Sequence, residues 1–202
     1  MKWTQLRRMA ISLPVAIFAA CLMIGISEYG NKQTSQSLSN LAHAYDTRTA
    51  LSTLTKEMLD AETGLRGYLL TSDENYLKPY NEAIQNISST LQRIRQLIET
   101  TPQGMEFFVP MSHSISRKTA EMDLSLRLFR EGNADALKFV MFTDMGNTDM
   151  SNIRELARKL DTLTAERAGR YQQDINSSLI MGRIGVATVT LFGLFAFYLY
   201  RS

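Results

Sequence analysis

The chain has 202 residues, of which 45% are hydrophobic and 21% are charged, and its formal net charge is +2. This length fits one domain with membrane anchors and excludes two full globular domains with anchors. All 20 acidic residues lie between Glu28 and Asp174, whereas basic residues flank two uncharged apolar runs. No basic patch suited to nucleic acid remains, so we expect no nucleic-acid partner.

The first predicted element is an apolar run from Met9 to Ile26 that contains no charged residue. As an α-helix, this run is just long enough to cross a hydrocarbon core of about 30 Å. By the positive-inside rule the flank before it stays in the cytoplasm, because it carries three basic residues, Lys2, Arg7 and Arg8. We therefore expect a cytoplasmic N-terminus over residues 1–8 and a transmembrane helix over residues 9–29.

Two other interpretations of this run are a cleaved signal peptide and a lipoprotein signal. The run is longer than the roughly 7–15 apolar residues of a signal peptide, and no convincing cleavage site ends it. Phe18-Ala19-Ala20-Cys21 resembles a lipobox only loosely, and the apolar run continues past Cys21. We therefore favour an uncleaved anchor. Cys21 is the only cysteine, so the domain that follows has no disulfide of its own.

The long middle segment, residues 30–178, has the apolar spacing of α-helices throughout. Apolar residues recur every three or four positions, as one buried helix face requires, over 51–68, 76–98, 108–129 and 153–175. No stretch alternates with the period of two that a β-strand needs. Short connections between amphipathic helices imply antiparallel neighbours. The sequence therefore predicts an all-α domain, an up-down-up-down four-helix bundle.

Three short segments predict where the helices begin and end. Thr71-Ser72-Asp73-Glu74 has the form of a capping box, with Thr71 as the N-cap and Glu74 at the third helical position. Thr101-Pro102 suits an N-cap followed by a proline in the first turn. Gly132-Asn133 suits a helix stop followed by a new N-cap.

The second apolar run covers Ile184–Tyr200, again without a charged residue. It predicts a transmembrane helix over residues 179–200, after which residues 201–202 begin the cytoplasmic side. No proline follows Pro110, so we expect the fourth helix to run unbroken from about Ala134 into this span. Because the first and fourth helices are the longer pair, the bundle would stand on a two-helix stalk. The chain would then cross a bacterial inner membrane twice, with both termini cytoplasmic and the bundle in the periplasm.

The densest local signal is the segment Asp60–Thr71, with the sequence DAETGLRGYLLT. Inside a helix, Gly64 and Gly67 are each less favourable than alanine by about 1 kcal/mol. Two such glycines make sense where another helix passes too close for a side chain. Glu62 and Arg66 stand four positions apart, in the favourable order for an ion pair along one helix.

This motif closely resembles the signature of the third class of CHASE-type extracytoplasmic sensory domains. Ten residues carry the resemblance, namely Asp60, Glu62, Thr63, Gly64, Arg66, Gly67, Tyr68, Tyr76, Pro79 and Tyr80. It implies a periplasmic four-helix input domain of a receptor that ends in a histidine kinase, a cyclic-dinucleotide enzyme or chemotaxis-type signalling helices. We expect the sensory input and membrane-anchoring module of such a receptor, with a two-component sensor histidine kinase as the preferred class. The alternatives are a stand-alone accessory membrane protein and a structural envelope protein.

The motif residues have a structural and a functional interpretation. Glu62 and Arg66 either fix the top of the bundle or contact a small ligand or a partner subunit. Tyr68, Tyr76 and Tyr80 are either core aromatics with their hydroxyls at the rim or a stacking site. We favour the structural interpretation of both sets.

The sequence shows no catalytic or metal-binding constellation. His43 and His113 have no carboxylate or cysteine at ligand spacing, and no phosphate loop or nucleophile motif is present. We expect no metal, no cofactor and no enzyme activity in this chain. A kinase or cyclase activity would lie in an output domain beyond Ser202.

The partners we expect are the lipid bilayer, an unidentified small-molecule or protein stimulus, and a second copy of the chain in a homodimer. For the homodimer, the expected surface is a heptad-like face of the fourth helix around Leu160, Leu163 and Tyr171.

Overall fold

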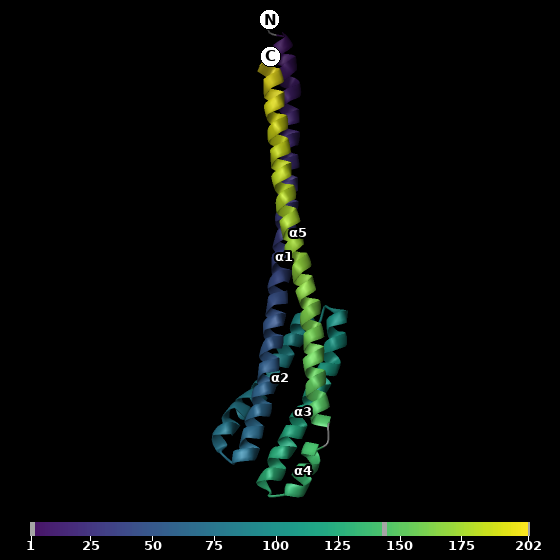
Figure 1. Cartoon of the computed structure of the whole chain (residues 1–202). Coiled ribbons are helices and arrows are strands. Elements are labelled where there is room, and N and C mark those ends of the chain that lie inside the picture. Colours follow the sequence, from purple (N-terminus) through teal and green to yellow (C-terminus); the bar gives the residue numbers. More distant parts are fainter. Residues whose placement is uncertain (1–2, 143–144, 202) are drawn as a thin grey trace. The chain divides into compact units, whose positions relative to one another are not determined.

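Figure 1 shows the computed structural model of the chain, which describes residues 3–142 and 145–201. Side chains are described over residues 20–141 and 147–195 and at Tyr198. The elements in chain order are α1 (Trp3–Thr71), the 3₁₀-helix η1 (Glu74–Tyr76), α2 (Leu77–Ile98), α3 (Pro102–Arg130), α4 (Ala134–Phe142) and α5 (Met145–Arg201). None of the described residues forms a strand, so the prediction of an all-α fold is confirmed.

The chain divides into two compact units. We call Met1–Ala42 together with Ala168–Ser202 the terminal unit, and His43–Arg167 the central unit. Helices α1 and α5 contribute residues to both units. The helices η1, α2, α3 and α4 lie entirely in the central unit, which therefore holds the apolar core and the candidate site.

The core of the central unit draws its side chains from four helices, α1, α2, α3 and α5. The large side chains that are most completely buried are Leu54, Met58, Ile94, Met111, Ile115, Met122, Ile153 and Leu160. They belong to the apolar faces that the sequence spacing predicts, so that prediction is confirmed. Leu160 is only 1% exposed, and Leu163 packs partly against the same core. The dimer surface expected around these two leucines is therefore wrong, because the core itself occupies that face.

The predicted boundaries on either side of α3 are confirmed. Helix α3 begins at Pro102, with Thr101 as its N-cap. After α3, Gly132 adopts a φ of 71°, the left-handed conformation that commonly ends a helix. The side-chain oxygen of Asn133 then accepts a hydrogen bond from the Ala136 N–H at 3.2 Å, as an N-cap does.

The capping box predicted at Thr71 is wrong. Thr71 is the last residue of α1, and its hydroxyl donates to the Gly67 carbonyl at 2.7 Å. The N-cap of the next element is Asp73, whose side chain accepts from the Asn75 N–H at 2.9 Å. Ser72, between them, has a φ of 57°. The chain therefore reverses in two residues and returns directly over the end of α1.

The single helix expected from about Ala134 is described as two elements. Helix α4 ends at Phe142 and packs against α3, whereas α5 begins at Met145. Residues 143 and 144, between them, lie outside the described residues. From Met145, α5 continues as one helix to Arg201, without a proline.

In the terminal unit, α1 and α5 lie beside each other: a Cβ built on Gly185 would stand 3.5 Å from Ile26 Cγ2. Large apolar side chains on both helices are exposed, including Ile24, Leu191 and Phe192. In the described part of the chain, one helix, within Asn147–Phe195, is long and apolar enough to cross a membrane. Most of the first predicted span falls on residues 1–19, whose side chains lie outside the described residues.

Candidate functional site

Both motif glycines lie directly under the returning chain. A Cβ on Gly64 would stand 2.7 Å from the Tyr76 carbonyl oxygen and 3.1 Å from the Tyr80 nitrogen. A Cβ on Gly67 would stand 2.3 Å from the Tyr76 ring. Neither position has room for a side chain as the structure stands. The glycines thus allow η1 and the start of α2 to cross α1 closely, as their spacing in the sequence suggested.

The three motif tyrosines have different environments. Tyr68 is buried, and its ring meets that of Phe129 edge-on, with centroids 5.2 Å apart. Tyr80 is buried in the same core, where burial raises the pKa of its hydroxyl. Tyr76 covers Gly67 but is 44% exposed, so it is not a core residue.

Three other motif residues, Asp60, Thr63 and Pro79, lie outside the apolar core. Thr63 and Pro79 are exposed, and the half-buried Asp60 pairs with Lys56 one turn earlier on α1. That ion pair has an Nζ–Oδ2 distance of 3.3 Å. None of these three residues contributes to the charged cluster described next.

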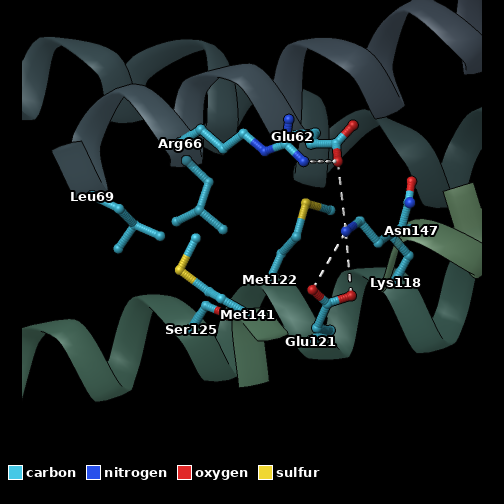
Figure 2. Close-up of a pocket in the computed structure, with 10 residues that line it drawn as sticks. Glu62, Arg66, Leu69, Lys118, Glu121, Met122, Ser125, Met141 and Asn147 are labelled. Carbon is cyan, nitrogen blue, oxygen red and sulfur yellow. Dashed lines mark hydrogen bonds and ion pairs between the residues drawn. The ribbon is translucent and has the colours of Figure 1, made fainter. Parts of the chain in front are cut away.

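Glu62 and Arg66 form the predicted ion pair, with 3.1 Å between Glu62 Oε1 and Arg66 Nη2. The structure adds two partners from α3, shown in Figure 2. Lys118 Nζ lies 3.7 Å from the same Glu62 oxygen and 3.2 Å from Glu121 Oε2. Two carboxylates and two cations therefore form one cluster that joins α1 to α3.

Lys118 is the unusual member of this cluster because it is only 5% exposed. A lysine is rarely buried so completely unless it is paired. The sequence held one sign of this burial: Lys118 follows Met111 and Ile115 and precedes Met122 at the three- and four-residue spacing of the core face. A lysine that interrupts an apolar stripe points inward. Lys118 and Glu121 are the functional candidates that the motif alone did not identify.

The four charged groups border a cavity of about 100 Å³ in the central unit. Ser125 of α3 and Asn147 of α5 add polar groups to its wall. The rest of the wall is apolar and consists of Leu65, Leu69, Met122 and Met141. In Figure 2, the charged side chains gather at one side of the space, and Leu69 lies at the other. The cavity can therefore bind charged and aliphatic groups at once.

Two other ion pairs join helices of the central unit at shorter distances. Arg48 Nε of α1 donates to Asp161 Oδ1 of α5 at 2.7 Å, with both side chains half-exposed. Arg117 of α3 pairs through Nε and Nη2 with the buried Asp149 of α5, and the same Nη2 also donates to Ser114 Oγ at 3.0 Å. These pairs hold α5 to α1 and α3.

Glu57 is a partly buried carboxylate outside the cavity. The Thr90 hydroxyl donates to its Oε1 at 3.2 Å, whereas its Oε2 is buried without a hydrogen-bond partner. Burial raises the pKa of Glu57, and the bond from Thr90 opposes this rise. The ionised form of Glu57 is therefore less favourable in the folded chain than in the unfolded chain.

The described residues contain no group of three histidine, cysteine, aspartate or glutamate side chains placed to hold a metal ion. They form an all-α domain whose distinctive feature is a small charged cavity between helices. The CHASE3 domain model matches residues 37–174, and the chain belongs to the CHASE3 family. This domain is sensory, non-catalytic and extracytoplasmic, and it occurs in signal-transduction receptors, so the resemblance predicted from the motif is confirmed. Searches of curated proteins and of solved structures found no significant match.

Proposed function

We propose that the chain is the periplasmic sensory input and membrane-anchoring module of a bacterial receptor. The preferred receptor class is a sensor histidine kinase of a two-component system. The observation that carries the proposal is the CHASE3 match over residues 37–174, which lies between the two apolar runs. A sensory domain bordered by spans suits a receptor that takes its stimulus on one side of the membrane and responds on the other.

The proposed architecture is an up-down-up-down four-helix bundle on a two-helix stalk, flanked by two transmembrane helices. The shared core of α1, α2, α3 and α5 supports the bundle. Short connections, such as 99–101 between α2 and α3, favour antiparallel neighbours. Exposed apolar side chains on α5 beyond residue 178 support the second span, because lipid is the environment in which such side chains are stable.

The proposed topology places both termini in the cytoplasm of a bacterial inner-membrane protein. Single cysteines introduced into a Cys21→Ser background test it. We expect cysteines replacing Gln92 and Glu131, both exposed, to react with an impermeant thiol reagent in intact spheroplasts. A cysteine replacing Thr4, in the predicted cytoplasmic flank, is the matched control and should react only after lysis. Labelling of the two periplasmic positions only after lysis would contradict the topology.

We also propose that the receptor is a homodimer, as the resemblance to this family of receptors implies. The dimer surface must avoid the core face of α5 that contains Leu160. Cross-linking of the full chain in the same membranes should give a band of twice the monomer mass. A monomer at every cross-linker concentration would count against the dimer without affecting the topology.

A further inference from the structure

We propose that the cavity between Glu62, Arg66, Lys118 and Glu121 binds a small zwitterion, an α-amino acid of about the size of alanine. The inference rests on the proposed sensory function and names the class of ligand that would occupy this domain. Three observations carry it: the charge balance of the cavity, the slack in its ion pairs and its volume.

The charges of the cavity favour a ligand that is itself balanced. Glu62 and Glu121 supply two negative charges, and Arg66 and Lys118 supply two positive charges. A ligand with one net charge would leave an uncompensated charge at a partly desolvated site, which is costly. A zwitterion keeps the balance, with its carboxylate toward Lys118 and Arg66 and its ammonium group toward the two glutamates.

The ion pairs of the cavity are longer than a charge-assisted hydrogen bond usually is, as are several exposed pairs of the chain such as Lys56–Asp60 at 3.3 Å. Lys118 lies 3.2 Å from Glu121 and 3.7 Å from Glu62, and the Arg66–Glu62 distance is 3.1 Å. Charge-assisted hydrogen bonds are usually about 2.7–2.9 Å long. Two other pairs of this chain, Arg48–Asp161 and Lys159–Glu155, reach 2.7 Å. The charged groups around the cavity therefore keep bonding capacity that a ligand can use.

The burial of Lys118 strengthens this inference. A buried ion pair commonly contributes no more stability than apolar side chains of similar volume. A loosely paired, 5% exposed lysine is thus a poor way to stabilise a core. The buried Lys118 ammonium group is instead well placed to bind the carboxylate of a ligand.

The size and the apolar wall limit the ligand further. The cavity of about 100 Å³ is smaller than the closed apolar cavity of about 150 Å³ that accepts benzene, which has six heavy atoms. It is not closed, since the Arg66 side chain at its edge is 66% exposed, and it suits a ligand of about six heavy atoms at most. Leu69, Met122 and Met141 offer a surface for a short aliphatic group. Alanine satisfies these limits, whereas an aromatic amino acid exceeds the volume.

Calorimetric titration of the full chain in lipid nanodiscs tests the proposal. We expect L-alanine to bind saturably at one site per chain and to raise the melting temperature of the protein. Propionate, which lacks only the ammonium group, and ethylamine, which lacks only the carboxylate, should bind at least about tenfold more weakly. L-phenylalanine should not bind.

Variants then assign the binding to the cavity. Lys118→Met and Arg66→Gln should each weaken alanine binding by about tenfold or more. Arg66 is 66% exposed at its side chain, so Arg66→Gln keeps the test valid if Lys118→Met does not fold. Lys159→Met, which breaks an exposed pair on α5, is the matched control and should bind as the parent does.

Three results would overturn the proposal: no alanine binding by the folded parent chain, equal binding of propionate or ethylamine, or unchanged binding in Arg66→Gln. Each is independent of the cysteine-labelling experiment. If labelling still places the central unit outside the cytoplasm, the sensory proposal stands and only the assigned ligand is wrong.

Discussion

Helices α1 and α5 bury Leu54 and Ile153 completely in the central unit, yet they expose Ile24 and Phe192 in the terminal unit. Removing apolar surface from water lowers the free energy by about 25 cal/mol for each Å² buried, which favours burial. A concentration of exposed apolar side chains is what a membrane or another apolar partner favours. The same two helices thus carry one apolar surface suited to a core and another suited to lipid.

The largest expected effect is a difference in stability between two variants, one with a substitution on the core surface and one with a substitution on the exposed apolar surface. Leu54→Ala should lower the free energy of unfolding of the central unit by about 2–5 kcal/mol, because it leaves a cavity in the core. Leu191→Ala, at an exposed leucine of the terminal unit, should change it by less than about 0.5 kcal/mol. Thermal denaturation of the detergent-solubilised chain, followed by circular dichroism, measures both. Equal losses would mean that Leu191 also lies in a packed core.

Glycines extend the comparison, because the same substitution should have opposite signs in the two units. Gly64→Ala should lower stability by about 1–2 kcal/mol, since its Cβ would meet the Tyr76 backbone oxygen at 2.7 Å. Gly169→Ala, in the terminal unit, meets nothing within 4 Å and should raise stability by up to about 1 kcal/mol. Melting temperatures of the two variants check the signs.

Gly67→Ala should fall between these two cases. Its Cβ would meet the Tyr76 ring rather than backbone, and a half-exposed ring can turn aside. The double variant with Tyr76→Ala should recover whatever stability Gly67→Ala loses. A larger loss of stability for Gly67→Ala than for Gly64→Ala would contradict this order. It would mean that the Tyr76 ring yields less readily than the Tyr76 backbone.

The smallest expected effect concerns Glu57, a charged group that the central unit half buries. Its pKa is raised by burial, so the folded chain holds the proton more tightly than the unfolded chain. Stability is then highest below the ordinary pKa of glutamate and falls as pH rises toward the raised value. Glu57→Gln should remove this fall and gain less than about 1 kcal/mol at neutral pH. Glu82→Gln, at an exposed glutamate of α2, is the control for urea titrations between pH 4 and pH 7.

The all-α fold, the four core faces and the boundaries around α3 follow from the sequence because they depend on local rules. Apolar spacing identifies faces such as that of Leu54, and Pro102 and Gly132 fix helix ends by their own backbone preferences. The capping box failed because Thr71 satisfies two local patterns. Its hydroxyl donates back to the Gly67 carbonyl and also accepts from the Asp73 N–H at 3.2 Å, while Asp73, two residues later, is the N-cap of the next element.

The candidate site was only half predictable for a different reason. Glu62 and Arg66 are four positions apart, so their ion pair is a property of one helix. Lys118 and Glu121 join them through the packing of α3 against α1, which no local pattern encodes. The dimer surface failed in the same way, since the sequence shows that Leu160 is on an apolar face but not what covers that face.

The pair of Arg48 and Asp161, separated by 113 positions, has a consequence for the order in which the chain folds. Closing so long a loop is slow relative to forming neighbouring helices such as α2 and α3. During synthesis, α1, α2 and α3 emerge well before the segment of α5 that contains Ile153 and Leu160. Until that segment arrives, the core around Leu54 lacks the side chains that α5 supplies. The nascent chain therefore passes through a stage in which its core is open on one side, when a chaperone that binds apolar surfaces would protect it from aggregation.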